Sequence, residues 1–170
     1  TFTNIEGVIG SNFDDTFMGD ANSNSFVGLG GNDTIDGGDG SDWVWYGHSP
    51  DGVTIDLSTG TASSTSGGND TLINIEEVHG SNFADTIIGD AKENWFYPDN
   101  LGDSSAPAST VGSSDTIDGG SGDNDTLSYW GTTYSQGTSL NGVTIDLSAG
   151  TAIDPAGNTD TISNIDDIQG

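Results

Sequence analysis

Residues 37–45 read Gly-Gly-Asp-Gly-Ser-Asp-Trp-Val-Trp. This block has every element of the pattern G-G-x-G-x-D-x-U-x, in which U is an apolar residue. The pattern is typical of a parallel β-helix or β-roll, in which short strands alternate with tight turns. Residues 37–45 therefore predict a coiled chain of short strands.

The same pattern continues on the N-terminal side of this block at an interval of nine residues. Glycines open the successive blocks, at Gly10, Gly19, Gly28 and Gly37. A carboxylate or amide stands sixth in each block, at Asp15, Asn24, Asp33 and Asp42. An apolar residue stands eighth, at Phe17, Phe26, Ile35 and Val44. The phrase Asp-Thr-apolar occurs seven times in the chain, so chance does not explain it.

Each nine-residue unit predicts a turn followed by a three-residue strand. Glycines in the first six residues permit positive φ, and the eighth residue points into the core. Two units complete a coil of about 18 residues, so alternate turns stack about 4.8 Å apart on one edge. A cation between stacked turns meets carboxylates and backbone carbonyls. That shell of hard oxygens suits Ca²⁺ better than Mg²⁺, which prefers a tight octahedron.

The composition is strongly acidic, with 27 Asp and Glu against 1 Lys and Arg and a formal net charge of -26. Such a chain is either disordered or neutralised by cations when it folds. The regular apolar spacing favours the second reading. The charge opposes binding to nucleic acid or to an anionic membrane surface. The chain has no apolar run of about 20 residues, so we expect no membrane insertion.

The chain contains no Cys, which excludes disulfides and thiolate metal sites. The absence of Cys also fits an exported protein. The chain begins at Thr1 without a Met or a signal-peptide pattern, so we expect a segment of a longer protein.

Longer phrases also recur. Residues 1–10, 71–80 and 161–170 resemble one another, as do 10–26 with 80–96 and 51–62 with 141–152. We therefore expect residues 1–170 to form one array segment, with internal repeats 1–70 and 71–160 and the start of a third at 161–170. Extra residues in the second copy predict inserted surface loops at about 100–112 and 131–140.

In the phrase that spans 51–62, Val53, Ile55 and Leu57 alternate with polar residues, which predicts a half-buried strand. Gly60 then predicts a turn. The expected fold is all-β: a right-handed parallel β-roll, or β-solenoid, with Ca²⁺ between coils, short extra strands and surface loops.

The blocks described above resemble the repeats-in-toxin (RTX) calcium-binding nonapeptide repeat. The resemblance implies that the sixth residue ligates calcium through its side chain and that early loop positions ligate through carbonyls. It names Asp33, Asp42, Asp115 and Asp125 as the strongest side-chain ligands. Asp15, Asp85, Asp70 and Asp160 come next. Carbonyl ligands are expected from Gly28, Gly30, Gly37 and Asp39.

Some positions depart from the family pattern. Asn24 and Asn94 place an amide at the sixth position, and Phe13 and Phe83 replace a glycine. We expect an incomplete calcium site, or none, on the units that run from Gly10 to Phe26 and from Gly80 to Phe96.

The aromatic residues allow two interpretations. Trp43, Trp45, Tyr46, Trp95, Tyr97, Tyr129 and Trp130 form either a sugar-binding platform or caps and packing between modules, and packing is favoured. Recurrent Thr at the seventh position suits strands and, less plausibly, ice binding. No nucleophile motif predicts an enzyme.

The expected function is a calcium-binding structural repeat module of a large secreted or cell-surface protein, such as a stalk, sheath, filament or S-layer-like array. It is expected to fold on binding Ca²⁺ and to contact adjacent repeats or copies of itself. An adhesive or carbohydrate-binding module, with glycans as partners, and a calcium-binding appendage of an exported enzyme are the alternatives.

Overall fold

The computed structural model describes residues 5–99, 113–129 and 142–169. These residues form seventeen short strands and contain no helix. Accordingly, no helix in the described ranges has the length and hydropathy to cross a membrane. Both predicted inserted loops, at 100–112 and 131–140, lie outside the described residues.

Seven strands form the first sheet, in which every neighbouring pair is parallel. In spatial order they are β1 (Gly7–Ile9), β3 (Ser25–Val27), β5 (Trp43–Trp45), β9 (Glu77–His79), β11 (Trp95–Tyr97), β13 (Thr126–Ser128) and β17 (Asp167–Gln169).

Ten strands form the second sheet. In spatial order they are β14 (Thr144–Asp146), β15 (Thr151–Ile153), β16 (Thr159–Ser163), β12 (Thr116–Asp118), β10 (Thr86–Ile88), β6 (Val53–Asp56), β7 (Thr61–Ser64), β8 (Gly68–Ile73), β4 (Thr34–Asp36) and β2 (Thr16–Met18). Most pairs are parallel, but β7 and β15 run antiparallel to both of their neighbours.

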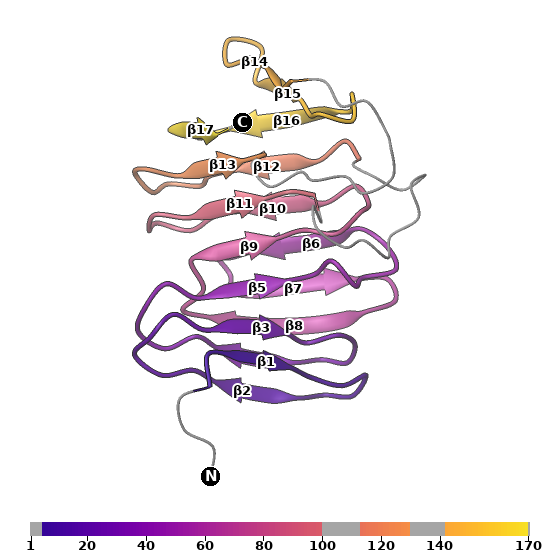
Figure 1. The fold of residues 1–170 in the computed structure, drawn as a ribbon, viewed down its shortest axis with the longest axis vertical. Helices are drawn as coiled ribbons and strands as arrows, with labels where there is room; N and C mark the ends of the chain where they lie inside the picture. Colours follow the sequence, from indigo (N-terminus) through magenta and orange to yellow (C-terminus); the bar gives the residue numbers. More distant parts are fainter. Residues whose placement is uncertain (1–4, 100–112, 130–141, 170) are drawn as a thin grey trace.

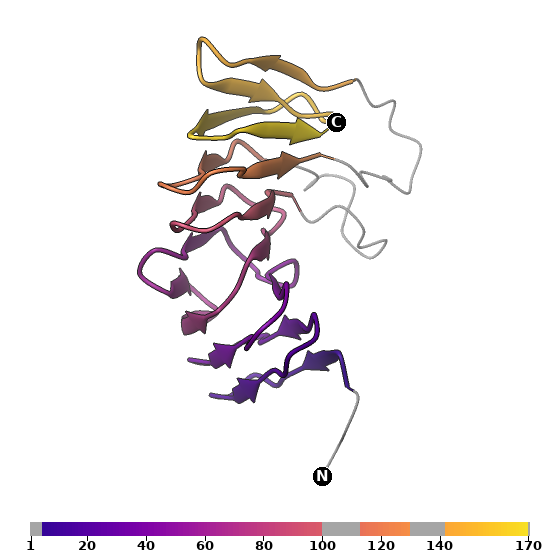
Figure 2. The same cartoon turned by 90° about the vertical axis from the view of Figure 1, so that its left-hand side faces the viewer.

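The chain winds between the two sheets, so that the strands stack along the long axis from β2 at the bottom to β14 at the top (Figure 1). Figure 2 shows the strands of the two sheets from the side. Thr16 pairs with Thr34, and Ser25 pairs with both Gly7 and Trp43. These partners lie 18 residues apart, which confirms the predicted coil of two nonapeptide units.

The core is a single file of apolar side chains between the sheets. In most strands of the coil the central residue is buried, and in β1, β2 and β17 at the two ends it is half-buried. Its neighbours are half-buried or exposed in every strand of the coil except β3 and β13. The most buried are Ile35, Val44, Val78, Ile87, Phe96, Ile117 and Leu127, all at 0 % exposure. The prediction that the eighth residue of each unit faces the core is confirmed.

A hairpin interrupts the coil after β5. Val53 and Ile55 of β6 are buried while Thr54 between them is exposed, which confirms the predicted alternation. Gly60 takes a φ of +67° in the turn that leads to β7. The strands β14 and β15 form the same hairpin in the second half of the chain. These hairpins add their strands to the second sheet only, so its ten strands face seven.

Candidate metal centre

The sixth residues of successive units form a ladder along one edge of the coil. Each side chain accepts a hydrogen bond from the backbone N–H of the equivalent residue one coil below. Asp33 Oδ1 accepts from Asp15 and Asp70 Oδ1 accepts from Asp33, both at 2.9 Å. Higher up, Asp115 Oδ1 accepts from Asp85 and Asp160 Oδ1 accepts from Asp115, both at 2.9 Å. These acids therefore stack in register between neighbouring turns.

A second ladder lies on the opposite edge. Asp42 Oδ1 accepts from the Asn24 N–H at 2.7 Å, and Glu76 Oε2 accepts from the Asp42 N–H at 3.1 Å. In the second half of the chain, Asp125 Oδ1 accepts from Asn94 at 2.9 Å, and Asp166 Oδ2 accepts from Asp125 at 3.0 Å.

One carboxylate oxygen of each acid is thus occupied by the neighbouring rung, and the other is left over at three positions. Oδ2 of Asp42, of Asp115 and of Asp125 is buried without any hydrogen-bond partner. The three residues are exposed by 0 %, 2 % and 0 %. A buried, unpaired carboxylate oxygen is costly, and a bound cation removes that cost. These three atoms therefore fit a divalent metal.

Glycines allow the loop backbone to approach these oxygens. A Cβ on Gly37 would lie 2.7 Å from Oδ2 of Asp42, and one on Gly119 would lie 2.9 Å from Oδ2 of Asp125. Oδ2 of Asp33 is likewise the atom nearest to a Cβ placed on Gly28. The carboxylates therefore point back into their own turns, where loop carbonyls lie.

The carbonyl oxygens that are expected to bind calcium accept no hydrogen bond from the described backbone. In the ranges 5–99, 113–129 and 142–169, no hydrogen bond ends on the carbonyl oxygens of Gly28, Gly30, Gly37 or Asp39. The same ranges contain no ready-made cluster of three or more Asp, Glu, His or Cys side chains that could hold a metal. A cation at these turns would therefore draw most of its oxygens from the backbone.

The RTX calcium-binding nonapeptide repeat, a family model of four copies, matches residues 9–44, 77–97 and 112–128. These three segments are RTX calcium-binding repeats. The matched segments contain the three ladder acids with an unpaired oxygen, Asp42, Asp115 and Asp125, and also Asp15, Asp33 and Asp85. No curated protein matches the chain at a significant level.

Asp70 and Asp160 lie outside the matched RTX segments, and their environments differ from those of the unpaired acids. Tyr46 donates its hydroxyl to Asp70 Oδ2 at 2.9 Å, and Tyr129 donates to Asp160 Oδ2 at 2.6 Å. Both oxygens of each carboxylate are therefore occupied by protein donors.

The same contacts bear on the interpretation of the two tyrosines. Tyr129 is 1 % exposed, so it does not belong to a surface platform, and Tyr46 is half-buried and packs against the core. Trp130 lies outside the described residues.

Asp15 and Asp85 use a serine four residues earlier in the chain. Asp15 Oδ2 accepts from the backbone N–H and hydroxyl of Ser11, at 2.7 and 2.9 Å. Asp85 Oδ2 accepts from the Ser81 N–H at 2.6 Å, and its Oδ1 from the Ser81 hydroxyl at 2.8 Å. Asn24 and Asn94 make the equivalent bond to the backbone of Asp20 and Asp90. In these four turns, a backbone N–H at the start of the turn donates a hydrogen bond to the side-chain oxygen of the sixth residue.

Burial raises the pKa of most ladder acids because removal from water disfavours the charged form. It raises the pKa of Asp115 to about 9, assisted by the nearby Asp99, and the pKa of Asp85 and Asp160 to about 6. The pKa values of Asp33, Asp42 and Asp125 are also raised, mainly by burial. Without cations, the RTX ladder is therefore an unfavourable array of carboxylates.

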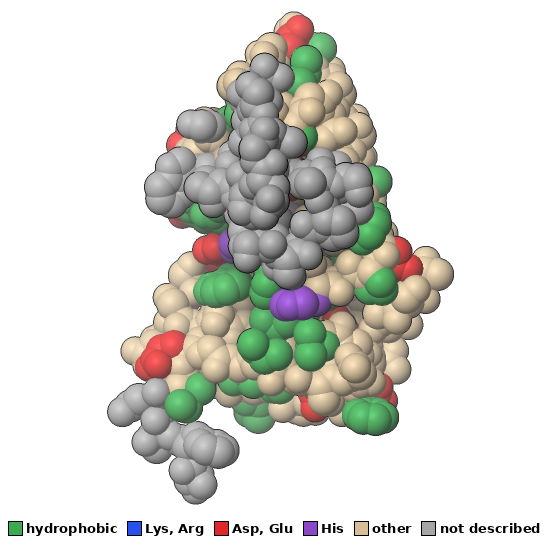
Figure 3. Space-filling view, turned by 45° about the vertical axis from the view of Figure 1, so that its right-hand side comes forward, with side chains coloured by type: hydrophobic (Ala, Val, Ile, Leu, Met, Phe, Trp, Pro, Cys, Tyr) green, Lys and Arg blue, Asp and Glu red, His purple; other side chains and the backbone are tan. Residues whose placement is uncertain are grey.

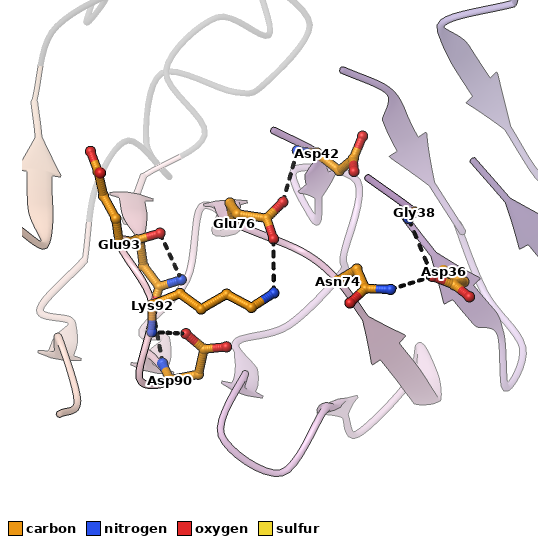
Figure 4. Close-up of polar contacts among 9 residues, drawn as sticks. Asp36, Gly38, Asp42, Asn74, Glu76, Asp90, Lys92 and Glu93 are labelled. Atoms are coloured by element: carbon orange, nitrogen blue, oxygen red, sulfur yellow. Dashed lines mark hydrogen bonds and ion pairs between the residues drawn. The ribbon is translucent and has the colours of Figure 1, made fainter. Parts of the chain in front are cut away.

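Lys92 is the single Lys or Arg of the sequence. Its ammonium group points at Glu76, in the ladder that contains Asp42 (Figure 4). Its Nζ lies 3.2 Å from Oε1 of Glu76, whose Oε2 accepts from the Asp42 backbone. An ammonium group therefore neutralises Glu76, next to the unpaired carboxylate of Asp42.

Sequence reasoning missed two acids. Asp166 lies in the same ladder as Asp125, and its equivalence to Glu76 in the repeated phrase was the signal that could have identified it. Asp99 is 1 % exposed with both carboxylate oxygens unpaired, and burial followed by the charge of Asp154 raises its pKa to about 8. No nonapeptide position predicts Asp99.

Proposed function

We propose that this chain is a structural module of a large secreted or cell-surface protein, such as a stalk, sheath, filament or S-layer-like array, and that it folds as its RTX repeats bind calcium. The observation that carries the proposal is the set of unpaired, buried oxygens on Asp42, Asp115 and Asp125. RTX repeats are structural rather than catalytic, and we assign no catalytic residue.

Coupling of folding to calcium follows from the charge and the core. A net charge of -26 opposes compaction, and a single file of apolar side chains gives little compensation. A metal that binds only the folded turns adds its binding free energy to folding. Millimolar calcium, as found outside cells, suits sites of this kind.

We assign the side-chain ligands to Asp33, Asp42, Asp115 and Asp125, whose second oxygen accepts no hydrogen bond from the described residues. Carbonyls of Gly28, Gly30, Gly37 and Asp39 complete the two turns of the first half. Asp70, Asp85 and Asp160 then hold neighbouring rungs in place, because protein donors occupy their oxygens. Asp15 keeps Oδ1 available.

We further propose that residues 1–170 form one array segment with internal repeats 1–70 and 71–160 and the start of a third at 161–170. Adjacent repeats or further copies of the chain are then its natural neighbours. An appendage of an exported enzyme stays the alternative, and the sequence that flanks this segment distinguishes the two.

A glycan-binding role has one observation in its favour. The ring of His79 stacks on Tyr97 with centroids 4.4 Å apart and tilts against Trp43 at 5.0 Å. Figure 3 shows hydrophobic side chains gathered on one face of the molecule. A Trp43→Ala variant that loses binding to a glycan array while keeping its calcium affinity would support this role.

Circular dichroism during a calcium titration tests the main proposal. We expect little β-signal in EDTA, a cooperative gain with Ca²⁺ and a much weaker response to Mg²⁺ at equal concentration. Equal β-signal in EDTA and in calcium would overturn the proposal.

A further inference from the structure

The two ends of the ten-stranded sheet have open edges. The strand β14 ends the sheet at the top of Figure 1, and β2 ends it at the bottom. No strand of the described residues pairs with the outer edge of either one. Unpaired strand edges present free backbone donors and acceptors to another strand.

In the interior of the same sheet, the strand β6 repeats the sequence of β14, and there the equivalent edge is covered by the strand β10. The strand β6 has the sequence Val-Thr-Ile-Asp, which recurs as residues 143–146 around β14. The strand β10 pairs in parallel with β6, with Thr54 opposite Thr86 and Asp56 opposite Ile88. Under this cover Ile55 is 0 % exposed, whereas its counterpart Ile145 is 37 % exposed.

Individual contacts at β6 show what the β14 edge lacks. The Val53 N–H donates to Oδ1 of Asp85 at 2.7 Å, and the Leu57 N–H donates to the Ile88 carbonyl at 2.8 Å. A Cβ on Gly52 would press against the Ala84 backbone. A Cβ on Gly142, the counterpart of Gly52, would meet nothing within 4 Å.

The strand β2 carries the other half of this interface. Residues 10–20 read GSNFDDTFMGD, and residues 80–90, which contain β10, read GSNFADTIIGD. Met18, the counterpart of Ile88, is 81 % exposed, and Phe13 is 79 % exposed. Oδ1 of Asp85 accepts a hydrogen bond from the Val53 N–H. Oδ1 of its counterpart Asp15 accepts no hydrogen bond from the described residues.

We propose that β2 of a second copy of this chain pairs in parallel with β14, in the register that β10 adopts on β6. Thr16, Phe17 and Met18 of the second copy then lie opposite Thr144, Ile145 and Asp146. The Val143 N–H binds Asp15 of the second copy, and the Leu147 N–H binds the Met18 carbonyl. This head-to-tail contact uses different surfaces on the two copies, so it propagates into a filament.

The seven-stranded sheet fits the same arrangement. The strands β1, β9 and β17 are three copies of one phrase, and β9 pairs with β11. In the assembly β17 takes the place of β1 beneath β3 of the second copy. The strand β1 buries little surface, because Val8 is half-buried and the other residues of 5–9 are exposed.

The inference rests on the proposed function, since the ends exist only in the calcium-bound fold. The test is analytical ultracentrifugation of the whole chain with calcium, in parallel with circular dichroism on the same samples. We expect concentration-dependent association. Met18→Asp places a charge opposite Asp146 and should weaken association at least tenfold, while Met18→Lys should strengthen it through a cross-strand ion pair.

Matched controls are Ile73→Asp and Ile73→Lys, because Ile73 is 42 % exposed on β8, an interior strand, and the charge changes are identical. A chain that gains its β-signal with calcium but stays monomeric, or Met18 variants that behave like the Ile73 variants, would overturn this inference alone. Absence of a calcium-dependent β-signal would overturn both proposals.

Discussion

The Tyr129 hydroxyl donates a 2.6 Å hydrogen bond to Oδ2 of Asp160, and this pair repeats the contact between Tyr46 and Asp70. In each half of the chain a tyrosine, half-buried at Tyr46 and buried at Tyr129, thus closes the ladder of acids at the rung that precedes the next repeated phrase. Asp160 in turn holds the Asp115 backbone. Both oxygens of Asp160 therefore accept hydrogen bonds, whereas Oδ2 of its neighbour Asp115 accepts none.

Loss of the Tyr129 hydroxyl should destabilise the calcium-bound fold. Tyr129→Phe leaves a buried carboxylate oxygen of Asp160 without its donor, which costs about 1–3 kcal/mol. Urea unfolding in saturating calcium measures the difference from the wild type. Tyr97→Phe is the control, because Tyr97 is only half-buried. Equal effects of the two variants would show that the Asp160 contact has no special role.

Replacement of one unpaired carboxylate should remove a calcium site without unfolding the chain. Asp42→Asn keeps an acceptor for the Asn24 N–H but loses the charge, as Asn24 itself does one coil below. Isothermal titration calorimetry should report one site fewer, or one site weakened by about tenfold or more. Asp39→Asn removes an exposed charge from the same turn and should leave the site intact. If both variants lose the same affinity, the effect is one of net charge alone.

A side chain at Gly37 should block the same site sterically. Gly37→Ala places a Cβ 2.7 Å from Oδ2 of Asp42 and still closer to the Asn74 carbonyl. Overpacking of this kind costs about 1–3 kcal/mol. Thermal melts with calcium, at a protein concentration low enough to keep the chain monomeric, measure the loss, and Gly142→Ala, which meets nothing within 4 Å in the single chain, is the control. A Gly37→Ala variant as stable as Gly142→Ala would contradict the tight turn described here.

Acid should stabilise the calcium-free chain. The folded-state pKa is about 9 for Asp115 and about 6 for Asp85 and Asp160, against 3.8 for the unfolded chain. Between these values the folded state binds more protons, so its stability falls as pH rises. The stability from these groups is complete below about pH 4 and is lost progressively by about pH 9.

Circular dichroism in EDTA from pH 9 to pH 4 checks this expectation, and we expect β-signal to increase on acidification. Protons and calcium compete for the same oxygens, so calcium affinity should decline over the same range. A calcium-free chain with no gain of β-signal at pH 4 would contradict the raised pKa values.

The fold was largely predictable because the nonapeptide pattern is local. The apolar eighth residue, such as Ile35 or Val44, marks each strand, and the 18-residue register follows from two units per coil. The position in the turn marks Asp42, Asp115 and Asp125 as ligands, and each has one buried, unpaired oxygen in the structure, while their role as ligands stays a prediction.

Other features depend on contacts between distant parts of the chain. The tyrosine contacts to Asp70 and Asp160 span 24 and 31 residues, and no periodic pattern encodes them. The antiparallel direction of β7 depends on the turn at Gly60, where the sequence predicted a turn but not the strand that follows it. Asp99 lies at no repeat position, so only its burial identifies it.

The central claim is that divalent cations occupy the turns beside the unpaired carboxylates. A crystal structure of the chain grown in calcium tests it most directly. We predict ions about 2.3–2.6 Å from Oδ2 of Asp42, Asp115 and Asp125, each completed by loop carbonyls. Turns that hold only water at these oxygens in saturating calcium would contradict the account.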